Sequence, residues 1–482
     1  MNRKTTVVFL ILLVTLITSK LLHAELRLPS SADRRPNVSI DPFERARDAI
    51  KKLPSRAEPK PQAPPEEPAA TEAVEEKKSS PFLEKPTEDA FDSQTNQDAE
   101  ADENMAGESF TQEFSIVVDS INRISGGPPP QEDESQVGSS AIPGVISYAA
   151  ELDTSAADLW SNGLFAFNAM LTFGTGEGST SSDIIGDFHG VSGTDAGDNG
   201  FKIYQFYYQH TFPHSHSSFI AGIHDVNNDF YVAEYAGLFV NGTFGFGAAI
   251  GEAAGPSSYP STSFGIRYKV ELTPKSYFQV AAYDGEPGEV TELIDTSFDK
   301  NGGVFMITEV GLLNGEPGNN QGYYKVGVGG WYIDKDMNTF GLEDGEEGAS
   351  SIPGTGGMYF LAETSIGKSV GLFLKAGRAD GDSNRYSQFY AGGINYTGLI
   401  PRRDDDIIGF GIVHSRQSAT FMDLGENRNT MFVGEFAYEF TYAAQIYDWL
   451  MVQPDFQYVL QPSMDPNNGN AVVLGIRLEA VY

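Results

Sequence analysis

The chain has 482 residues but no cysteine, and basic residues are scarce in it. Without cysteine there can be no disulfide, no thiol catalysis and no cysteine metal site, so another kind of bonding must stabilise the fold. The 32 Lys and Arg residues face 66 Asp and Glu residues, which gives a formal net charge of −34. So acidic a chain repels phosphate backbones, and we do not expect nucleic-acid binding.

Long apolar runs are scarce as well, and the N-terminal one is too short for a comfortable membrane span. Arg3 and Lys4 precede an apolar run at 7–17, and Leu22-His23-Ala24 places a small residue at a cleavage position. This pattern predicts a signal peptide over residues 1–24 and export of the mature chain. The alternative is an uncleaved anchor helix, but no apolar run follows Glu25 to extend it.

Residues 25–140 have too little apolar surface to offset the entropy of an ordered chain. They contain 14 of the 26 prolines and carry 13 basic against 25 acidic residues. We predict a mostly disordered, Pro/Glu-rich arm in the periplasm. One helix is expected within it, over 108–125, because apolar residues recur there at helical spacing: Phe110, Phe114, Val117, Val118, Ile121 and Ile124. This helix would plug the pore, dock on a partner, or serve as a short packing element.

Residues 141–482 alternate in polarity with a period of two. In the last strand one row contains Val472, Leu474, Ile476, Leu478 and Ala480, and the other contains Val473, Gly475, Arg477, Glu479 and Val481. A strand of about ten residues with one apolar face is typical of a membrane-spanning β-barrel, although a soluble sandwich can also contain one.

The connections between these strands are alternately short and long. Tight turns are expected at 274–275, 367–368 and 447–448, and long polar loops at 174–200, 284–302 and 335–356. Outer-membrane barrels have this asymmetry, whereas a soluble sandwich does not explain it. We therefore predict an all-β, antiparallel transmembrane barrel over 141–482. We expect 16 strands, because bacterial barrels have even strand counts and the length of this region suits that number.

Charged rows of such a barrel must face the lumen, because charge facing lipid at mid-depth costs about 2–4 kcal/mol per residue. Because side chains alternate between the two faces of a strand, the residues in the charged rows share the inward face. The predicted pore-lining residues are Arg267, Lys269, Glu271, Lys325, Trp331, Lys375, Glu435, Glu439, Asp455 and Arg477. Facing basic and acidic rows would select solutes by polarity and size. The alternative for each residue is that its side chain only contacts water inside the barrel and has no part in selecting solutes.

A narrow pore also needs a segment that enters the lumen. The candidate is 230–249, in which four residues could contact a sugar: Tyr231, Glu234, Tyr235 and Asn241. The competing interpretation of this stretch is an ordinary pair of strands.

Several blocks together resemble the carbohydrate-selective porins of the OprB type. They are IAGIHDVNNDF at 220–230, YPSTSFGIRY at 259–268, YDGEPG at 283–288, GGWY at 329–332, FYAGGINYTGLIP at 389–401, VQPDFQY at 452–458 and AVVLGIR at 471–477. The resemblance covers most of 141–482 and implies a sixteen-stranded outer-membrane barrel through which sugars diffuse into the periplasm. It does not extend to residues 25–140.

Enzymatic chemistry has little support in the sequence. His210, His214 and His216 lie close together, but no carboxylates beside them complete a known metal site. Asp404, Asp405 and Asp406 follow two arginines and fit a solvated ion cluster in a loop. We therefore expect no catalytic residue, no metal and no cofactor.

Two alternatives to a sugar porin remain open. One is a structural barrel that tethers the envelope, with its arm binding peptidoglycan or a periplasmic protein. The other is a general ion-selective porin. In each case outer-membrane lipid surrounds the barrel, and a homo-oligomer is compatible with the sequence.

Overall fold

The computed structural model describes residues 109–129, 139–174, 180–288, 302–318, 322–338, 351–424 and 427–482. The predicted signal peptide at 1–24 and the predicted arm up to residue 108 lie outside these described residues. None of the helices in the described ranges has the length and apolar character needed to cross a membrane.

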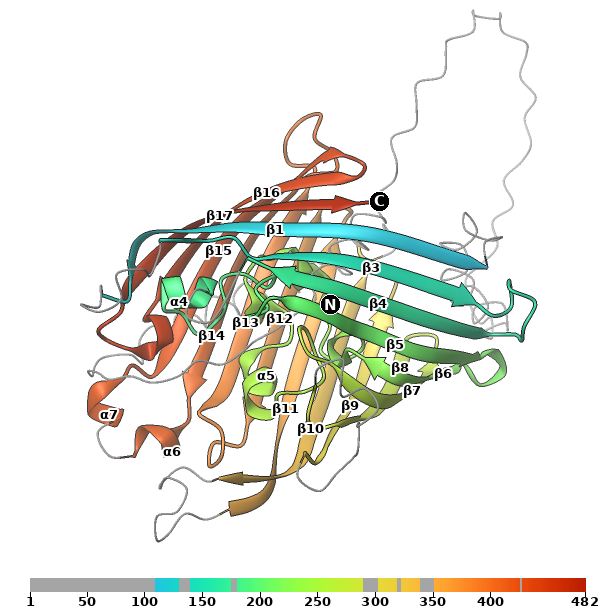
Figure 1. The fold of residues 1–482 in the computed structure, drawn as a ribbon, viewed down its shortest axis with the longest axis horizontal. Coiled ribbons are helices and arrows are strands. Elements are labelled where there is room, and N and C mark those ends of the chain that lie inside the picture. The colour runs from blue at the N-terminus through green and yellow to red at the C-terminus, as the bar shows by residue number, and fades with distance from the viewer. Residues whose placement is uncertain are drawn as a thin grey trace, which may run out of the picture.

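The described chain forms one closed antiparallel sheet (Figure 1). Because each strand alternates in polarity, pairing neighbours in register gathers the apolar side chains on one surface and the polar side chains on the other. Strand β17 pairs with β1, and this pairing closes the cylinder. Apart from the two-residue β2, the sheet contains sixteen strands, which confirms the predicted barrel.

The strands follow sequence order around the barrel. They are β1 (Phe110–Gly127), β2 (Ser140–Ala141), β3 (Gly144–Asp153), β4 (Gly163–Phe173), β5 (Gly200–Phe212), β6 (Ser217–His224), β7 (Ser263–Thr273), β8 (Ser276–Asp284), β9 (Val304–Asn314), β10 (Tyr324–Asn338), β11 (Ser351–Ile366), β12 (Val370–Ala379), β13 (Tyr386–Thr397), β14 (Ile407–Gln417), β15 (Gly434–Tyr447), β16 (Leu450–Leu460) and β17 (Gly469–Val481).

Short helices occur in the connections. The α-helices are α4 (Ser181–Ile185), α5 (Ala248–Ala254), α6 (Ala419–Met422) and α7 (Asn427–Thr430). The 3-10 turns are η1 (Pro213–Ser215), η2 (Val226–Asn228), η3 (Glu234–Leu238), η4 (Gly242–Phe244) and η6 (Pro462–Met464).

The predicted helix over 108–125 is wrong, because Phe110–Gly127 is strand β1 and pairs with both β17 and β3. The barrel wall therefore includes residues from 110 onward rather than from 141. The error arises because Val117 and Ile121 lie on the inward face yet are buried and apolar. With apolar residues on both faces, the period of two is obscured. Since Phe110–Ile124 is part of the wall, it is neither a plug nor a docking helix.

Short turns gather at one end of the barrel and long connections at the other. The β7–β8, β11–β12 and β15–β16 turns contain two or three residues. Phe110 pairs with Leu152, and Ser115 pairs with Val481, so β1 begins and β17 ends at the short-turn end. In outer-membrane barrels the short turns are periplasmic. We call this end the periplasmic end and the opposite end the outer end.

Two of the long connections fold into the barrel. We call residues 180–199, between β4 and β5, inner segment 1, and residues 225–262, between β6 and β7, inner segment 2. Inner segment 2 contains η2, η3, η4 and α5 rather than the pair of strands that was the alternative for 230–249. Helix α5 packs against β10, β11, β12 and β13.

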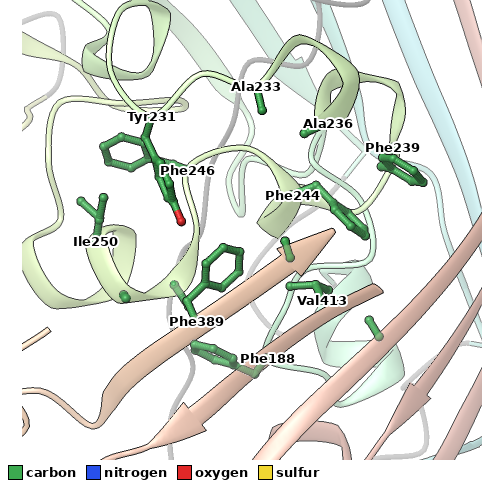
Figure 2. Packing of buried hydrophobic residues seen from close by; sticks show 14 of the residues in the cluster. Phe188, Tyr231, Ala233, Ala236, Phe239, Phe244, Phe246, Ile250, Phe389 and Val413 are labelled. Carbon is green, nitrogen blue, oxygen red and sulfur yellow. The ribbon is translucent and has the colours of Figure 1, made fainter. Parts of the chain in front are cut away.

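The interior therefore contains an apolar core that a hollow barrel would lack. Figure 2 shows Phe244 and Phe239 of inner segment 2, Phe188 of inner segment 1, and Phe389 and Val413 of the wall. The Phe239 and Phe244 rings stack with their centroids 4.4 Å apart. These side chains are buried and exclude water from this part of the lumen, which holds the two inner segments against the wall.

Glycines on inward rows make this close approach possible. A Cβ on Gly411 would lie 2.7 Å from the Phe244 ring, and one on Gly371 would lie 2.2 Å from the Tyr235 ring. Real Cβ atoms do not approach neighbours so closely. The glycine content of the strands thus has a packing role, because it leaves room for the aromatic side chains of inner segment 2.

Candidate functional site

The strand register places all ten predicted pore-lining residues on inward rows. In β7, for example, Ile266 is 52% and Tyr268 41% exposed on the outer surface, whereas Arg267 between them is 4% exposed. The other nine are Lys269, Glu271, Lys325, Trp331, Lys375, Glu435, Glu439, Asp455 and Arg477. They fall into two groups that differ in what their side chains contact.

Buried glutamates of the wall bind the backbone of inner segment 2. The Glu309 carboxylate of β9 accepts a hydrogen bond of 2.9 Å from the Tyr231 N–H. In β11, Glu363 accepts one of 3.1 Å from the Tyr235 N–H. Both carboxylates also accept from tyrosine hydroxyls of the wall, so neither is left without donors. Charge-assisted hydrogen bonds of this kind are stronger than neutral ones.

Glu439 of β15 holds the middle of the same segment. Its two carboxylate oxygens accept from the N–H groups of Val240 at 2.6 Å and Asn241 at 3.0 Å. The Asn241 side chain also donates to Gln457 of β16, at 3.1 Å. Two successive backbone N–H groups are therefore fixed by one wall residue, and the middle of inner segment 2 has a defined position.

Glu435 of β15 performs the same role for inner segment 1. Its carboxylate accepts from the N–H groups of Phe188 and His189, both within 3.0 Å, and lies 3.0 Å from the His189 ring nitrogen. Ser463 at the outer end of the wall donates a further hydrogen bond of 2.5 Å. Beside this carboxylate, burial and the Glu435 charge raise the pKa of Asp187 in inner segment 1 to about 7.

Lys375 of β12 binds backbone carbonyl oxygens of inner segment 2, whereas the glutamates bind its N–H groups. Its ammonium donates to the carbonyl oxygens of Phe244, at 3.1 Å, and Gly245. The same nitrogen lies 4.1 Å from the centre of the Tyr231 ring. A buried ammonium needs such partners, because an unpaired one is very costly to desolvate.

Arg267 anchors the start of inner segment 2. Its guanidinium donates to Asp229 at 3.1 Å and to the Ser218 hydroxyl at 2.6 Å. His224 also lies 3.4 Å from the Asp229 carboxylate. Asp229 follows η2 directly, so this ion pair fixes the chain where it enters the lumen.

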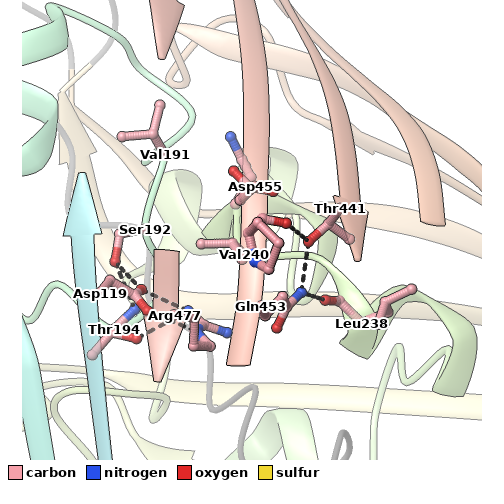
Figure 3. Close-up of polar contacts among 12 residues, drawn as sticks. Asp119, Val191, Ser192, Thr194, Leu238, Val240, Thr441, Gln453, Asp455 and Arg477 are labelled. Carbon is pink, nitrogen blue, oxygen red and sulfur yellow. Dashed lines mark hydrogen bonds and ion pairs between the residues drawn. The ribbon is translucent and has the colours of Figure 1, made fainter. Parts of the chain in front are cut away.

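Arg477 forms a buried ion pair across the seam where the barrel closes. Its guanidinium binds both carboxylate oxygens of Asp119 in β1, each at 2.7 Å. It also donates to the Thr194 hydroxyl at 3.0 Å, while Ser192 donates to Asp119 at 2.7 Å (Figure 3). Inner segment 1 is thereby attached to the seam between β17 and β1.

Polar residues of β16 complete the contacts with both inner segments. Gln453 donates to the Leu238 carbonyl at 2.8 Å, as Figure 3 shows, and Gln457 donates to the Val191 carbonyl at 2.7 Å. Asp455 accepts from Gln457 at 2.9 Å. Trp331 of β10 has a packing role, since its buried ring stacks on Phe305 with centroids 6.2 Å apart.

Lys269, Glu271 and Lys325 differ from the residues above. They are half-buried, and none of the three side chains has an ion pair or hydrogen bond to another residue in the described ranges. Lys269 and Glu271 lie near the end of β7, and Lys325 near the start of β10, so all three face the periplasmic half of the lumen. Lys269 also lies 5.7 Å from the centre of the Tyr277 ring.

The four predicted constriction residues divide in the same way. Tyr231 and Asn241 are buried. Glu234 and Tyr235, at the start of η3, are half-buried. The Tyr235 hydroxyl accepts a hydrogen bond from Gly318 at 3.3 Å, and burial raises the pKa of Tyr235 to about 12. Of these four side chains, Glu234 and Tyr235 are therefore the two that keep part of their surface exposed.

Sequence reasoning missed several residues of this interior network. Glu309 and Glu363 lie on inward rows, but Phe305 and Ile307 make the Glu309 row largely apolar. Asp119 was assigned to a helix, and Asp229 lies outside any strand. If β1 is assigned as a strand, and if alternation is applied along the whole of β9, Asp119 and Glu309 are predicted to face inward.

The residues considered for metal or acid/base chemistry lie elsewhere. His210 is on an outward row beside Phe212, and His214 lies in the η1 turn. Asp406 pairs with Arg403 at 2.6 Å in the β13–β14 turn. Within the described ranges no group of three or more His, Cys, Asp or Glu residues could hold a metal ion.

Comparison with known proteins agrees with this architecture. The family model "Carbohydrate-selective porin, OprB family" matches residues 144–482. Porin B of Pseudomonas aeruginosa is 25% identical over 269 residues, which are 49% of this chain and 59% of that protein. The chain thus spans about three fifths of the length of this curated relative. The high-pH structure of Pseudomonas putida OprB superimposes with a TM-score of 0.66 at 18% identity, covering 80% of this chain and 97% of the other.

Strand β1 precedes the matched region, yet it completes the barrel on which the match depends. The outward rows are apolar and the turns are asymmetric, as in outer-membrane channels. This architecture is that of a channel in the outer membrane rather than that of an enzyme. Since the family model covers more than two thirds of the sequence, the chain belongs to the carbohydrate-selective porin OprB family.

Proposed function

We propose that the protein is an outer-membrane porin through which sugars and small polar solutes diffuse passively into the periplasm. The observation that carries this proposal is that two long connections fold inside a closed barrel and are bound there by wall residues. Such segments narrow the lumen to a path that discriminates between solutes. Membership of the carbohydrate-selective family and the similarity to Porin B support the same activity.

The solute path that we propose runs past the half-buried residues of the periplasmic half. Lys269, Lys325, Glu234 and Glu271 present donors and acceptors for sugar hydroxyls. Their charges are of both signs, so the path is polar without strongly favouring one ion. Tyr235 adds an aromatic face that could contact the apolar side of a pyranose ring. In this proposal Tyr231 and Asn241 position inner segment 2 rather than touch the solute.

Passage by diffusion requires no catalytic group, and we propose that the protein has no enzymatic activity. Arg267, Lys375, Glu435, Glu439, Asp455 and Arg477 then act by holding the inner segments. They position the backbone of those segments, which determines the width of the pore, and do not themselves contact sugar.

The test is planar-bilayer conductance of the purified protein with glucose, maltose, sucrose and small organic acids added in turn. We expect a steady channel whose ion current falls as a permeating sugar is added, and whose block weakens in Lys269→Gln/Lys325→Gln. Lys275→Gln/Lys368→Gln serves as the control, because it removes the same two charges from exposed periplasmic turns. A channel that conducts ions but responds to no sugar would support a general porin instead.

A further inference from the structure

A pair of arginines faces outward near the outer end of the barrel wall. Arg378 is the second-last residue of β12, and Arg416 is the second-last residue of β14. The register pairs each of them with Gln388 of β13, so the three side chains form one row across neighbouring strands. With strands about 4.8 Å apart, the two arginine Cα atoms are separated by about 10 Å.

The two arginines face the surface that contacts lipid. Arg378 lies between inward-facing, buried Gly377 and Ala379, and is itself exposed. It pairs across the sheet with Met358, which is 65% exposed on the same outer surface. Arg416 is half-buried on the equivalent row. A cation that faced lipid at mid-depth would cost about 2–4 kcal/mol, but near the interface this falls to about 0–1 kcal/mol.

An aromatic cluster lies directly below the row, and its His414 and Phe436 rings are buried. His414 stacks on Phe436 with ring centroids 3.9 Å apart, and Tyr390 lies next to it with centroids 6.4 Å apart. The Tyr390 hydroxyl donates to the Gln388 side-chain oxygen at 3.3 Å, which orients the amide between the arginines. Amphipathic rings are typical of the headgroup level of a membrane.

These arginines also differ from three other arginines of the described chain, which pair with carboxylates. Arg267, Arg477 and Arg403 each have a carboxylate partner within 3.1 Å. Among the described residues, neither Arg378 nor Arg416 has an ion pair or a side-chain hydrogen bond. In a chain with a net charge of −34, two cations on one outward row without a partner in the described ranges are unexpected. An anion supplied by the membrane would complement them.

We propose that Arg378, Gln388 and Arg416 form a binding site for the phosphate headgroup of an outer-leaflet lipid. Guanidinium groups bind phosphate oxygens through paired hydrogen bonds, and the amide of Gln388 supplies a further donor between them. The acyl chains of the same lipid would lie along the apolar side chains below the row, which include Met358. The site is separate from the sugar path, because its residues occupy the opposite face of the wall.

The test is native mass spectrometry of the full chain in detergent, titrated with diphosphoryl lipid A and with the same lipid after removal of both phosphates. We expect the wild type to prefer the phosphorylated probe. Arg378→Gln/Arg416→Gln should weaken its binding by about tenfold, as expected for losing charge-assisted hydrogen bonds, with a smaller loss in each single variant. Lys368→Gln, at the periplasmic end, should bind like the wild type.

Two results would overturn the proposal. One is a wild type that binds both probes equally, since the phosphate would then have no role. The other is a double variant that keeps wild-type affinity for diphosphoryl lipid A. Ion conductance measured on the same samples checks that the variants are folded, because none of these side chains faces the lumen.

Discussion

Arg267 and Lys269 lie two residues apart on the same inward row of β7, yet they belong to different regions of the lumen. Arg267 is buried and bonded to Asp229, at the start of inner segment 2. Lys269 is half-buried and faces the periplasmic half, without an ion pair among the described residues. The alternation of side chains along a strand thus decides which of them face inward, whereas contacts with the inner segments decide which of these are buried.

The same division separates the acidic residues. Glu439 accepts two backbone N–H groups of inner segment 2, whereas Glu271 on the periplasmic side accepts none. Charges in the first region therefore hold the inner segments, and we propose that charges in the second region contact solutes. Substitutions of equal charge in the two regions should then have different consequences.

The largest effect is expected where an anchor also closes the barrel. Arg477→Gln leaves the Asp119 carboxylate buried without its bidentate partner, which should cost about 3–5 kcal/mol of stability. Thermal unfolding of the barrel in detergent measures this loss. Arg402→Gln, in an exposed turn, is the control and should unfold like the wild type. If Arg477→Gln were as stable as Arg402→Gln, the seam ion pair would not stabilise the closed barrel.

A smaller effect is expected from loosening inner segment 2 alone. Glu439→Gln replaces an acceptor of two N–H groups by a side chain that can accept through one atom, at a cost of about 1–3 kcal/mol. We expect a larger single-channel conductance and faster proteolysis within residues 225–262. Glu271→Gln removes the same charge without breaking a bond to the segment. Equal conductance and proteolysis in the two variants would contradict the distinction between anchors and solute-facing residues.

Removing positive charge from the periplasmic half of the lumen should change the ion selectivity of the channel without changing the stability of the barrel. Lys269→Gln/Lys325→Gln deletes two half-buried cations, so the channel should become about twofold more cation-selective. The reversal potential in a salt gradient measures this shift. The matched control is Lys275→Gln/Lys368→Gln, which removes two charges from exposed periplasmic turns outside the lumen. An unchanged reversal potential would mean that the conducted ions do not pass these two residues.

A pH dependence is also expected for the stability of inner segment 1. Burial, together with the Glu435 charge, raises the pKa of Asp187 from 3.8 to about 7. Because the packed state holds this proton more tightly than the unfolded chain does, stability is lost as pH rises from about 4 to about 7. Proteolysis within residues 180–199 should be faster at pH 8 than at pH 5, and Asp187→Asn should remove the difference. A pH dependence that persists in Asp187→Asn would assign the effect to another group.

Much of the fold could be predicted from local alternation. The apolar row of β17 and the charged row of β7 identify membrane strands, because lipid excludes charge from one face. β1 was missed since Val117 and Ile121 face inner segment 1, and local sequence does not show that a lumen is filled. The tight turns were predictable because only two or three residues separate the strands there, and so short a connection can only be a turn between antiparallel neighbours.

The interior site was predictable only in part. The alternation of side chains along a strand predicts that Glu435 and Lys375 face inward. It does not predict their hydrogen-bond partners, which lie far away in sequence. Inner segment 2 was recognisable as an ambiguous stretch because its polarity does not alternate. Which of its residues stay half-buried depends on long-range packing, and for this reason Tyr231 and Tyr235 could not be distinguished beforehand.

The central claim is that inner segment 2 lies inside the barrel while the channel conducts. A Cβ on Gly377 of β12 would lie 3.2 Å from the Cβ of Ala249 in α5, close to the spacing of disulfide-bonded residues. Since the chain has no cysteine, Ala249→Cys/Gly377→Cys introduces a single possible cross-link. We predict that oxidation forms this disulfide in the membrane and leaves conductance at the value measured after reduction. Failure to cross-link, or a cross-link that sharply lowers conductance, would contradict the account.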